Sequence, residues 1–273
     1  MLHVSQSAIS EQVRDLEEEI GVPLFNRQNR RIRLTSHGEL FLEDARSILA
    51  AADKAIANVQ RSLNGEIGTL TIGFCIGGTG AFFPSLIKDF RNRFKDVQVS
   101  LVEMAPVMQQ QALQTGKIDI GFTRPMQPNH SMALRSEHFR TERLCAVLHQ
   151  SHRLARRHKI SMLELAEERF ILNDRNYSPA VFDKVISLCA EAGFSPRINA
   201  TATVSPGVVA LVEAGEGIAI LPEGAQAISR EEVVFVPLVE HSASIDLVIA
   251  WAPLHETPVL HSFLKLARLR TRK

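Results

Sequence analysis

The chain has 273 residues, of which 45% are hydrophobic and 22% are charged, and its formal net charge is +1. This length supplies material for about two domains with hydrophobic cores, and the composition is that of a soluble globular protein. No apolar run reaches the roughly 18 residues of a membrane span, polar residues interrupt the N-terminus where a signal peptide would be apolar, and three widely spaced cysteines indicate reduced thiols in the cytoplasm.

The first predicted helix begins after Ser5, a residue type that caps helix N-termini, and ends before Gly21, which suits the left-handed position after a helix. Its first turns carry polar side chains that can reach base edges or phosphates. The pattern predicts a DNA-reading helix with contacts from Ser5, Gln6, Ser7, Ser10, Gln12 and Arg14. A solvated helix face is the alternative interpretation of the same residues.

Short β-compatible segments follow within residues 24–35, around the turn pair Gln28-Asn29. Affinity for DNA depends on the local density of positive charge, which the net charge of the whole chain does not describe. Four arginines are concentrated in residues 27–33, and we expect them to contact phosphates from a small β-wing: Arg27, Arg30, Arg31 and Arg33. A run of this kind seen alone is also common on solvated surfaces.

A second helix is predicted from residues 35–36, where Ser36 and Glu39 form a capping box. About 27 residues at ~1.5 Å each would make a rod of about 40 Å. Apolar residues recur at steps of three and four, close to a heptad seam: Phe41, Ala45, Ile48, Ala52, Ala55, Val59 and Leu63. A small wing domain cannot bury so long a seam, so residues 36–64 are predicted to form a dimeric coiled coil. One long helix packed on its own chain is the alternative.

The pattern changes after a predicted hinge at residues 64–68, and strands then alternate with helices. Strands are expected at 70–74, 97–103, 118–122, 144–148, 170–172 and 218–222, with helices that end near 90, 113, 192 and 212. Crossover helices between strands imply a largely parallel sheet. A helix–glycine–strand unit occurs twice, at Leu113–Phe122 and Leu211–Ile220, which predicts two similar halves around a ligand cleft that closes by a hinge.

The last strand and helix, Ile245–Trp251 and Pro258–Leu269, are expected to return to the first half. Lobe I would then comprise residues 68–142 plus 244–273, and lobe II residues 143–243. Two crossing strands, near 140–144 and 239–244, would join the lobes.

Candidate ligand-binding residues lie at the ends of the predicted strands, where α/β sheets bind ligands. The glycine-rich segment 75–80 comes between a strand and a helix, where backbone N–H groups and the helix dipole favour an anion. Arg124 follows strand 118–122, and its guanidinium can hold a carboxylate through two hydrogen bonds. The predicted set is Cys75, Gly77, Gly78, Thr79, Arg124, Asn176, Tyr177, Pro179, Thr203 and Ser205. A tight turn without a ligand and a surface arginine are the alternatives.

The residue patterns also bear on metal binding, redox sensing and catalysis. His149 and His152 are three residues apart, as in some metal sites, but no nearby residue completes the set, so turn histidines are favoured. Cys75 has no evident partner thiol for redox sensing. The sequence contains no nucleophile–base pair and no phosphate loop ending in Lys-Ser/Thr, so we expect neither an enzyme nor a bound cofactor or metal.

Residues 2–35 resemble LysR-type transcriptional regulators in four segments: Val4–Ser10, Leu16–Gly21, Leu24-Phe25 and Arg33–Gly38. The resemblance continues through Gly116–Phe122 and Leu211–Ile218 and covers essentially the whole chain. Four shorter segments resemble the branch that senses aromatic acids or their ring-cleavage products: Glu103-Met104, Phe122–Arg124, Glu142–Leu144 and His149–His152.

This resemblance implies a fold that combines α+β and α/β parts. A winged helix-turn-helix in residues 1–35 would precede a linker helix in 36–64 and a two-lobed effector domain like the type 2 periplasmic binding proteins. The implied partners are promoter DNA, a small acidic metabolite, a second copy bound through the linker helix, a homotetramer and RNA polymerase, with no membrane. By position, Gly77 and Pro106 stand where related aromatic-acid sensors have hydroxyl residues, which adds Pro106 to the expected effector site.

Two features differ from the family pattern. Family members usually have about 25 further residues before the position of Met1, which form the first helix and most of the second and support the recognition helix. We therefore expect either that the start codon is assigned too late or that this is a truncated form with impaired DNA binding. Glu11 stands where the family often has a basic residue. The main expectation is an effector-responsive transcriptional regulator. The alternatives are a truncated effector-binding protein that acts through hetero-oligomers, and an enzyme on a periplasmic-binding-protein scaffold.

Overall fold

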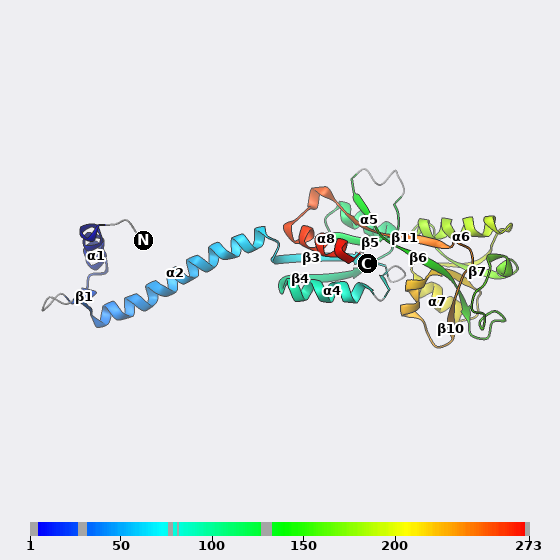
Figure 1. Cartoon of the computed structure of the whole chain (residues 1–273), viewed down its shortest axis with the longest axis horizontal. Coiled ribbons are helices and arrows are strands. Elements are labelled where there is room, and N and C mark those ends of the chain that lie inside the picture. The colour runs from blue at the N-terminus through cyan, green and yellow to red at the C-terminus, as the bar shows by residue number, and fades with distance from the viewer. Residues whose placement is uncertain (1–4, 27–31, 76–78, 81, 127–132, 271–273) are drawn as a thin grey trace. The chain divides into compact units, whose positions relative to one another are not determined.

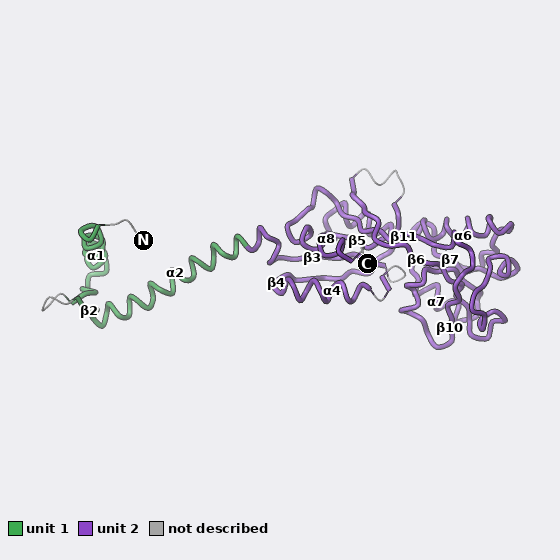
Figure 2. Tube along the Cα trace, viewed as in Figure 1, with its two compact units in different colours: residues 1–60 green, residues 61–273 purple. Residues whose placement is uncertain are grey.

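The structure of the chain is a computed structural model, and it describes residues 5–26, 32–75, 79–80, 82–126 and 133–270 (Figure 1). The chain divides into two compact units, residues 1–60 and residues 61–273 (Figure 2). Among the helices in the described ranges, none combines the length and the apolar composition that crossing a membrane requires.

The first unit contains a helix, a small hairpin and most of a long second helix: α1 (Gln6–Ile20), β1 (Phe25–Asn26), β2 (Arg33–Leu34) and α2 (Ser36–Leu63). Ser5 caps α1, because its Oγ accepts a hydrogen bond from the N–H of Ala8 at 3.3 Å, and Gly21 ends the helix with a φ of 79°. Strands β1 and β2 pair antiparallel. The predicted limits of the first helix and the predicted short strands are therefore confirmed, whereas the predicted turn pair Gln28-Asn29 lies outside the described residues.

The predicted capping box of Ser36 and Glu39 is wrong by one position. The cap is Thr35, whose Oγ1 accepts from the N–H of Gly38 at 3.0 Å and donates to the backbone oxygen of Pro23 at 2.8 Å. The carboxylate of Glu17 accepts from the N–H groups of Leu24 and Phe25 at 2.7 and 2.8 Å. These two side chains attach the hairpin to α2 and to α1.

The predicted hinge at residues 64–68 is tied to the second unit. Strand β3 (Ile67–Phe74) begins before the predicted strand and includes part of that segment. Gly65 has a φ of 67°, and a Cβ there would lie 2.3 Å from the backbone oxygen of Pro258. The hydroxyl of Ser262 donates to the backbone oxygen of Asn64 at 3.3 Å. Residues 64 and 65 are therefore packed against the 258–262 segment of the second unit.

A seven-stranded sheet runs through the second unit in the order β10-β6-β11-β5-β3-β4, with β9 paired to β6. The strands other than β3 are β4 (Asp96–Glu103), β5 (Ile120–Thr123), β6 (Arg135–His149), β9 (Ala219–Pro222), β10 (Val233–Pro237) and β11 (Ser244–Trp251). Among the described strands of this sheet, only β3–β4 and β3–β5 are parallel pairs. The prediction of a largely parallel sheet is therefore wrong here, because β6 and β11 run antiparallel to their neighbours.

Strand β6 joins the two halves of the unit. Its first part pairs with β11, from Arg135 opposite Trp251 to Arg143 opposite Ser244. Its last part pairs with β9 and β10, with Cys145 opposite Leu221 and Pro237. A separate parallel pair, β7 (Arg169–Asn173) and β8 (Arg197–Ala202), completes the second half. Figure 1 shows β6 passing from one half to the other.

Two separate sets of core side chains define two lobes. Lobe I is built around Phe90, Phe122 and Phe263, and lobe II around Phe170 and Leu188. Lobe I holds α4 (Phe82–Arg93), α5 (Pro106–Gln114) and α8 (Pro258–Arg270), and lobe II holds α6 (Pro179–Glu191) and α7 (Ser205–Glu213). Short 3₁₀ turns are η3 (Met162–Leu165), η4 (Glu223–Ile228) and η5 (Pro253–His255). Helices α5 and α7 are each followed by a glycine with positive φ and then a strand, as the repeated pattern predicts.

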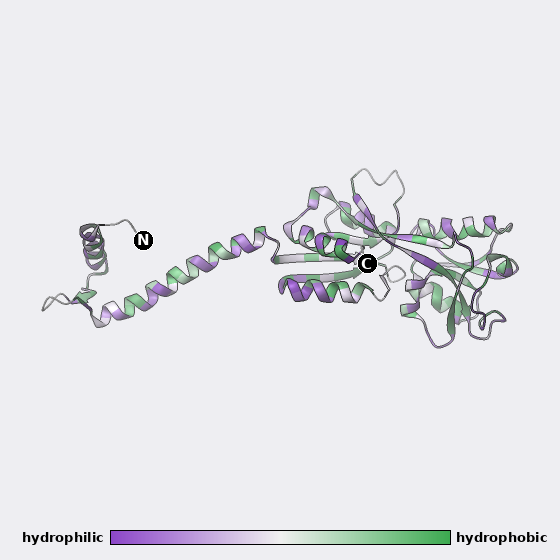
Figure 3. Ribbon diagram, in the orientation of Figure 1, coloured by the Kyte–Doolittle hydropathy of each residue, from purple (hydrophilic) through white to green (hydrophobic). Residues whose placement is uncertain are grey.

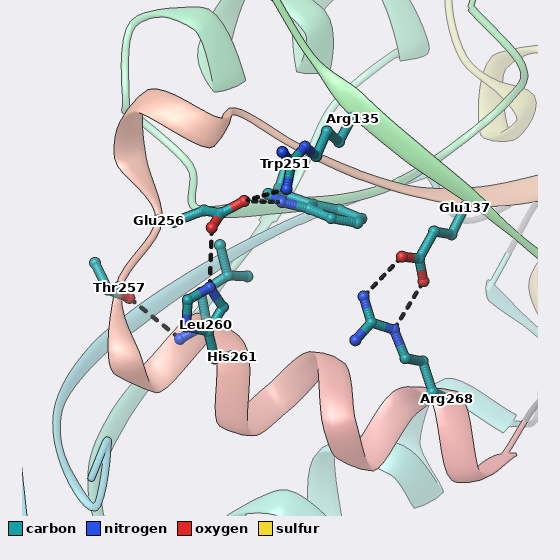
Figure 4. Close-up of polar contacts among 8 residues, drawn as sticks. All are labelled: Arg135, Glu137, Trp251, Glu256, Thr257, Leu260, His261 and Arg268. Atoms are coloured by element: carbon teal, nitrogen blue, oxygen red, sulfur yellow. Dashed lines mark hydrogen bonds and ion pairs between the residues drawn. The ribbon is translucent and has the colours of Figure 1, made fainter. Parts of the chain in front are cut away.

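Polar contacts attach α8 to the sheet of lobe I (Figure 4). The carboxylate of Glu256 accepts a hydrogen bond from Nε1 of Trp251 at 2.8 Å and pairs with His261 at 3.0 Å. Arg268 donates two hydrogen bonds to Glu137 of β6 at 2.7 and 2.9 Å. Both ends of α8 are thus linked to strands that reach the boundary between the lobes.

Candidate effector cleft and DNA-binding surface

The side chains predicted to read DNA from α1 are all exposed. Some of their polar groups already have partners within the helix. Ser5 supplies the cap, the hydroxyl of Ser10 donates to the backbone oxygen of Gln6 at 2.9 Å, and Arg14 lies 3.9 Å from Glu18. Arg33 is exposed on β2, whereas Arg27, Arg30 and Arg31 lie outside the described residues. A DNA-contacting role for this set stays a prediction.

Helix α2 presents an apolar stripe along its length. Figure 3 shows hydrophobic residues recurring along this helix, and Ile48 in the predicted seam is 69% exposed. Leu49 and Ile56 are also exposed and widen the stripe beyond the predicted seam. Large apolar side chains that recur on one helix face in this way are typical of a surface that binds another helix.

A small cavity of about 30 Å³ lies between the lobes. Residues of lobe I that line it include Cys75, Glu103 and Pro106 with Arg124, and residues of lobe II include Asn173, Ser178, Thr203 and Ser205. Five residues of the predicted effector site therefore meet at one place, although they come from four separate parts of the sequence: Cys75, Pro106, Arg124, Thr203 and Ser205.

The other predicted effector residues lie elsewhere. Thr79 is buried, and its hydroxyl donates to the backbone oxygen of Cys75 at 3.4 Å. Asn176 is exposed, with its N–H bonded to Asp174, and Pro179 starts α6; neither lines the cavity. Tyr177 lines a neighbouring groove. Gly77 and Gly78 lie outside the described residues.

Sequence reasoning missed three polar residues of the cavity: Glu103, Asn173 and Ser178. A signal for Ser178 was present, because a serine directly before a proline is typical of a helix start. Asn173 is the last residue of β7, so the strand-end rule that selected Arg124 would also have selected it.

Arg124 is paired inside the protein. Its Nη2 lies 2.7 Å from Oε2 of Glu142, and both side chains are only 2% exposed. Its Nη1 donates to the backbone oxygen of Asp246 at 3.2 Å. Glu142 belongs to β6 and Asp246 to β11, so Arg124 is fixed to both of the strands that run between the lobes. With Glu103 also present, the charged residues at the cavity carry no excess of positive charge.

Cys75 is a half-buried thiol at this site. Burial raises the pKa of the Cys75 thiol, and the nearby Arg124 opposes that rise only in part. Its Sγ contacts the backbone oxygen of Phe122 at 3.8 Å. A protonated thiol is a poor nucleophile and a poor metal ligand, so Cys75 contributes shape and a weak hydrogen-bond donor.

Three helices begin at the cavity. The N-cap residues of α5, α6 and α7 are Ala105, Ser178 and Val204, and all three line it. Among the described residues, no side chain caps any of these helix ends, although each has a proline in its first turn and the N–H of Val107 in α5 donates to the backbone oxygen of Tyr177 at 3.2 Å. The N-terminus of a helix carries unpaired N–H groups and a partial positive charge. Three such ends converging on one cavity favour an anion there even though Arg124 is neutralised.

The two histidines with metal-like spacing have different partners. His149 lies 3.6 Å from Glu232, and His152 lies 3.3 Å from Glu168. Within the part of the chain that the structure describes, no three His, Cys, Asp or Glu side chains are grouped closely enough to hold a metal ion.

Comparisons with known proteins agree with these two parts of the chain. Residues 1–39 match the family model "Bacterial regulatory helix-turn-helix protein, lysR family", and residues 63–272 match "LysR substrate binding domain". The HTH-type transcriptional regulator AlsR of Bacillus subtilis (strain 168) is 31% identical over 97% of this chain and 87% of its own length.

Two solved structures are similar over most of the chain. Full-length CbnR complexed with its target DNA has a TM-score of 0.82 and 28% identity, over 99% of this chain and 91% of that one. The BenM effector binding domain with its effector benzoate has a TM-score of 0.63 and 28% identity, over 74% of this chain and 90% of that one. The two matched family models together cover nearly all of the sequence, and the chain belongs to the LysR family of bacterial transcriptional regulators.

Proposed function

We propose that this protein binds promoter DNA through α1 and the β1–β2 wing, and that a small carboxylate in the cleft changes this binding. It acts in the cytoplasm, is not an enzyme, and assembles as a homodimer through α2 and further as a homotetramer. The related CbnR has been crystallised with target DNA, and the related BenM domain with benzoate, which supports both halves of the proposal.

The observation that carries the proposal is the convergence of three uncapped helix N-termini on one cavity. A carboxylate there would accept hydrogen bonds from backbone N–H groups and from the hydroxyls of Ser178, Thr203 and Ser205. This arrangement recognises the charge of an acid without a free cation, which fits the pairing of Arg124 with Glu142.

Calorimetric titration with benzoate and with benzamide tests the effector half of the proposal. The two molecules have nearly the same shape, and only benzoate is charged. Benzoate is expected to bind at least about tenfold more tightly, since a hydrogen bond to a charged group contributes about 1.5–3 kcal/mol. Ser205→Asp, which places a negative charge at the start of α7, should abolish benzoate binding. Ser136→Asp, at an exposed position on β6, is the matched control.

Fluorescence anisotropy of the full chain on its own upstream DNA tests the regulatory half. Sequence-selective binding that changes on addition of benzoate is the expected result. Equal binding of benzoate and benzamide, or DNA binding that is weak, unselective and indifferent to benzoate, would contradict the proposal.

A further inference from the structure

An open groove adjoins the cleft cavity along α5. Its volume is about 750 Å³, and it lies between one face of α5 and Tyr177 of lobe II. Four residues line both the groove and the cavity: Met104, Ala105, Thr203 and Val204. The two spaces therefore meet at the N-termini of α5 and α7.

The two spaces differ in what they can hold. A cavity of about 30 Å³ has room for roughly two water-sized groups, which is the size of the two oxygens of a carboxylate. Pockets that hold whole small molecules usually measure about 300–1,000 Å³, and the groove falls in that range. The body of any acid whose carboxylate enters the cavity must therefore lie in the groove, unless the lobes separate.

The groove is lined mainly by apolar side chains. Met104, Met108 and the ring of Tyr177 supply large apolar surfaces, and Met108 and Tyr177 are 44% and 36% exposed. Lys117 is the one charged residue among the described residues that line it. No lining carboxylate is present there to pair with a cationic ligand, so the groove suits an uncharged apolar chain or ring.

We infer that the effector is a carboxylic acid with an elongated apolar body, which lies along the groove between Met108 and Tyr177 while its carboxylate occupies the cavity. This inference rests on the proposed function and adds to it the shape and polarity of the ligand. The flexible thioether of Met108 and the flat ring of Tyr177 would contact opposite sides of the ligand body.

The test is calorimetric titration of the full chain with acetate, butanoate, hexanoate and octanoate. Each buried methylene should strengthen binding about fourfold, until the groove is filled. Tyr177→Ala and Met108→Ser change exposed side chains, and Tyr177 keeps the backbone oxygen that accepts from the N–H of Val107 at 3.2 Å. Both variants should weaken octanoate binding about tenfold and leave acetate within about twofold.

Leu254→Ala is the matched control, because Leu254 is 87% exposed and lies outside the groove. It should leave the whole series unchanged. Equal affinity for acetate and octanoate, or a dependence on chain length that survives in both groove variants, would overturn the inference. Equally tight binding of octan-1-ol would overturn it too, since the carboxylate would then play no part.

The results separate this inference from the proposed function. If acids bind equally whatever their length and benzamide still binds weakly, only the inference about the groove fails. If no carboxylate binds the chain, both fail.

Discussion

The ion pair of Arg124 and Glu142 is the residue-scale feature that most changes the interpretation of the cleft. The strand-end rule correctly placed Arg124 at the cavity, but the sequence did not show that its charge is already balanced. Glu142 reaches Arg124 because β6 runs through both lobes. A crossing strand near 140–144 was predicted, but its start at Arg135 and its closeness to Arg124 were not. A pairing set by tertiary structure is not visible in local sequence patterns.

Glu142→Gln should therefore destabilise the protein strongly. Removing one partner of a buried pair leaves the other charge uncompensated, which costs about 3–5 kcal/mol. Glu137→Gln is the matched control, because its pair with Arg268 is largely exposed and should contribute about 0–1 kcal/mol. Urea unfolding of both variants measures the difference. A similar loss of unfolding free energy in the two variants would show that burial does not make the removal of one charged partner more costly.

The same variant addresses the predicted role of Arg124. With Glu142 neutral, the guanidinium charge is no longer cancelled, so benzoate should bind more tightly if Arg124 contacts the carboxylate. Calorimetry on Glu142→Gln gives the answer, and unchanged affinity would assign the anion to the helix N-termini alone.

Glu256 gives a pH-dependent signal at the residue scale. The hydrogen bond from Trp251 holds the pKa of Glu256 below its ordinary value of 4.5, with a smaller effect from His261. Because the folded state favours the carboxylate, its stabilising contribution is present above pH 4.5 and is lost as the pH falls through the lowered pKa.

Trp251 is the only tryptophan in the chain, so its fluorescence reports this contact directly. We expect its emission to change as the pH is lowered below 4.5, and Glu256→Gln to remove that transition. Glu137→Gln should retain it. A transition that persists unchanged in Glu256→Gln would mean that another group controls the emission.

At the scale of elements, the apolar stripe of helix α2 leads to a prediction about the oligomeric state. Ala52 lies in the apolar stripe and Ala50 lies roughly opposite on the helix at 100° per residue, while both are exposed. Ala52→Asp should therefore disrupt the proposed dimer, whereas Ala50→Asp introduces the same charge and should not. Light scattering after size-exclusion chromatography distinguishes monomer from dimer. If both variants stay dimeric, the interface lies outside this stripe.

The elements that sequence patterns predicted are those with a strong apolar period or a clear cap. The seam of α2 and the limits of α1 are examples. Strand β8 was missed because only half-buried alanines interrupt its exposed residues. Strand β10 was missed although its run Val233–Val236 consists of β-branched and aromatic residues, which is a usual strand signal. The first part of β6 was missed because its charged side chains face solvent on the strand. Edge and half-exposed strands leave weak signals of this kind.

At the scale of the whole second unit, the repeated helix–glycine–strand pattern correctly predicted two similar α/β halves. It did not predict that the sheet is mixed. Parallel pairing is confined to each lobe, and every antiparallel pair described in the seven-stranded sheet includes β6 or β11, the strands that run between the lobes. Local patterns carry no information on strand direction across a boundary that forms only in the folded chain.

Ligand binding should be visible as a change in the stability of the whole molecule. At a concentration about 100 times its dissociation constant, benzoate should add about 2.7 kcal/mol to the free energy of unfolding. For a domain of this size, each kcal/mol shifts the melting temperature by roughly 2–4 °C. The melting temperature should thus rise by several degrees with benzoate, and it should not rise with benzamide.

The location of that stabilisation decides whether the cleft is the site. The segments 105–108, 178–181 and 204–208 form the N-termini of α5, α6 and α7, so a bound carboxylate should slow their amide exchange. Helix α4 does not supply residues to the cavity and is the internal control. Hydrogen exchange followed by mass spectrometry compares these segments in one experiment. Equal protection of α4 would indicate a general effect on stability, whereas protection confined to the three helix ends would place the carboxylate at the point where the lobes meet.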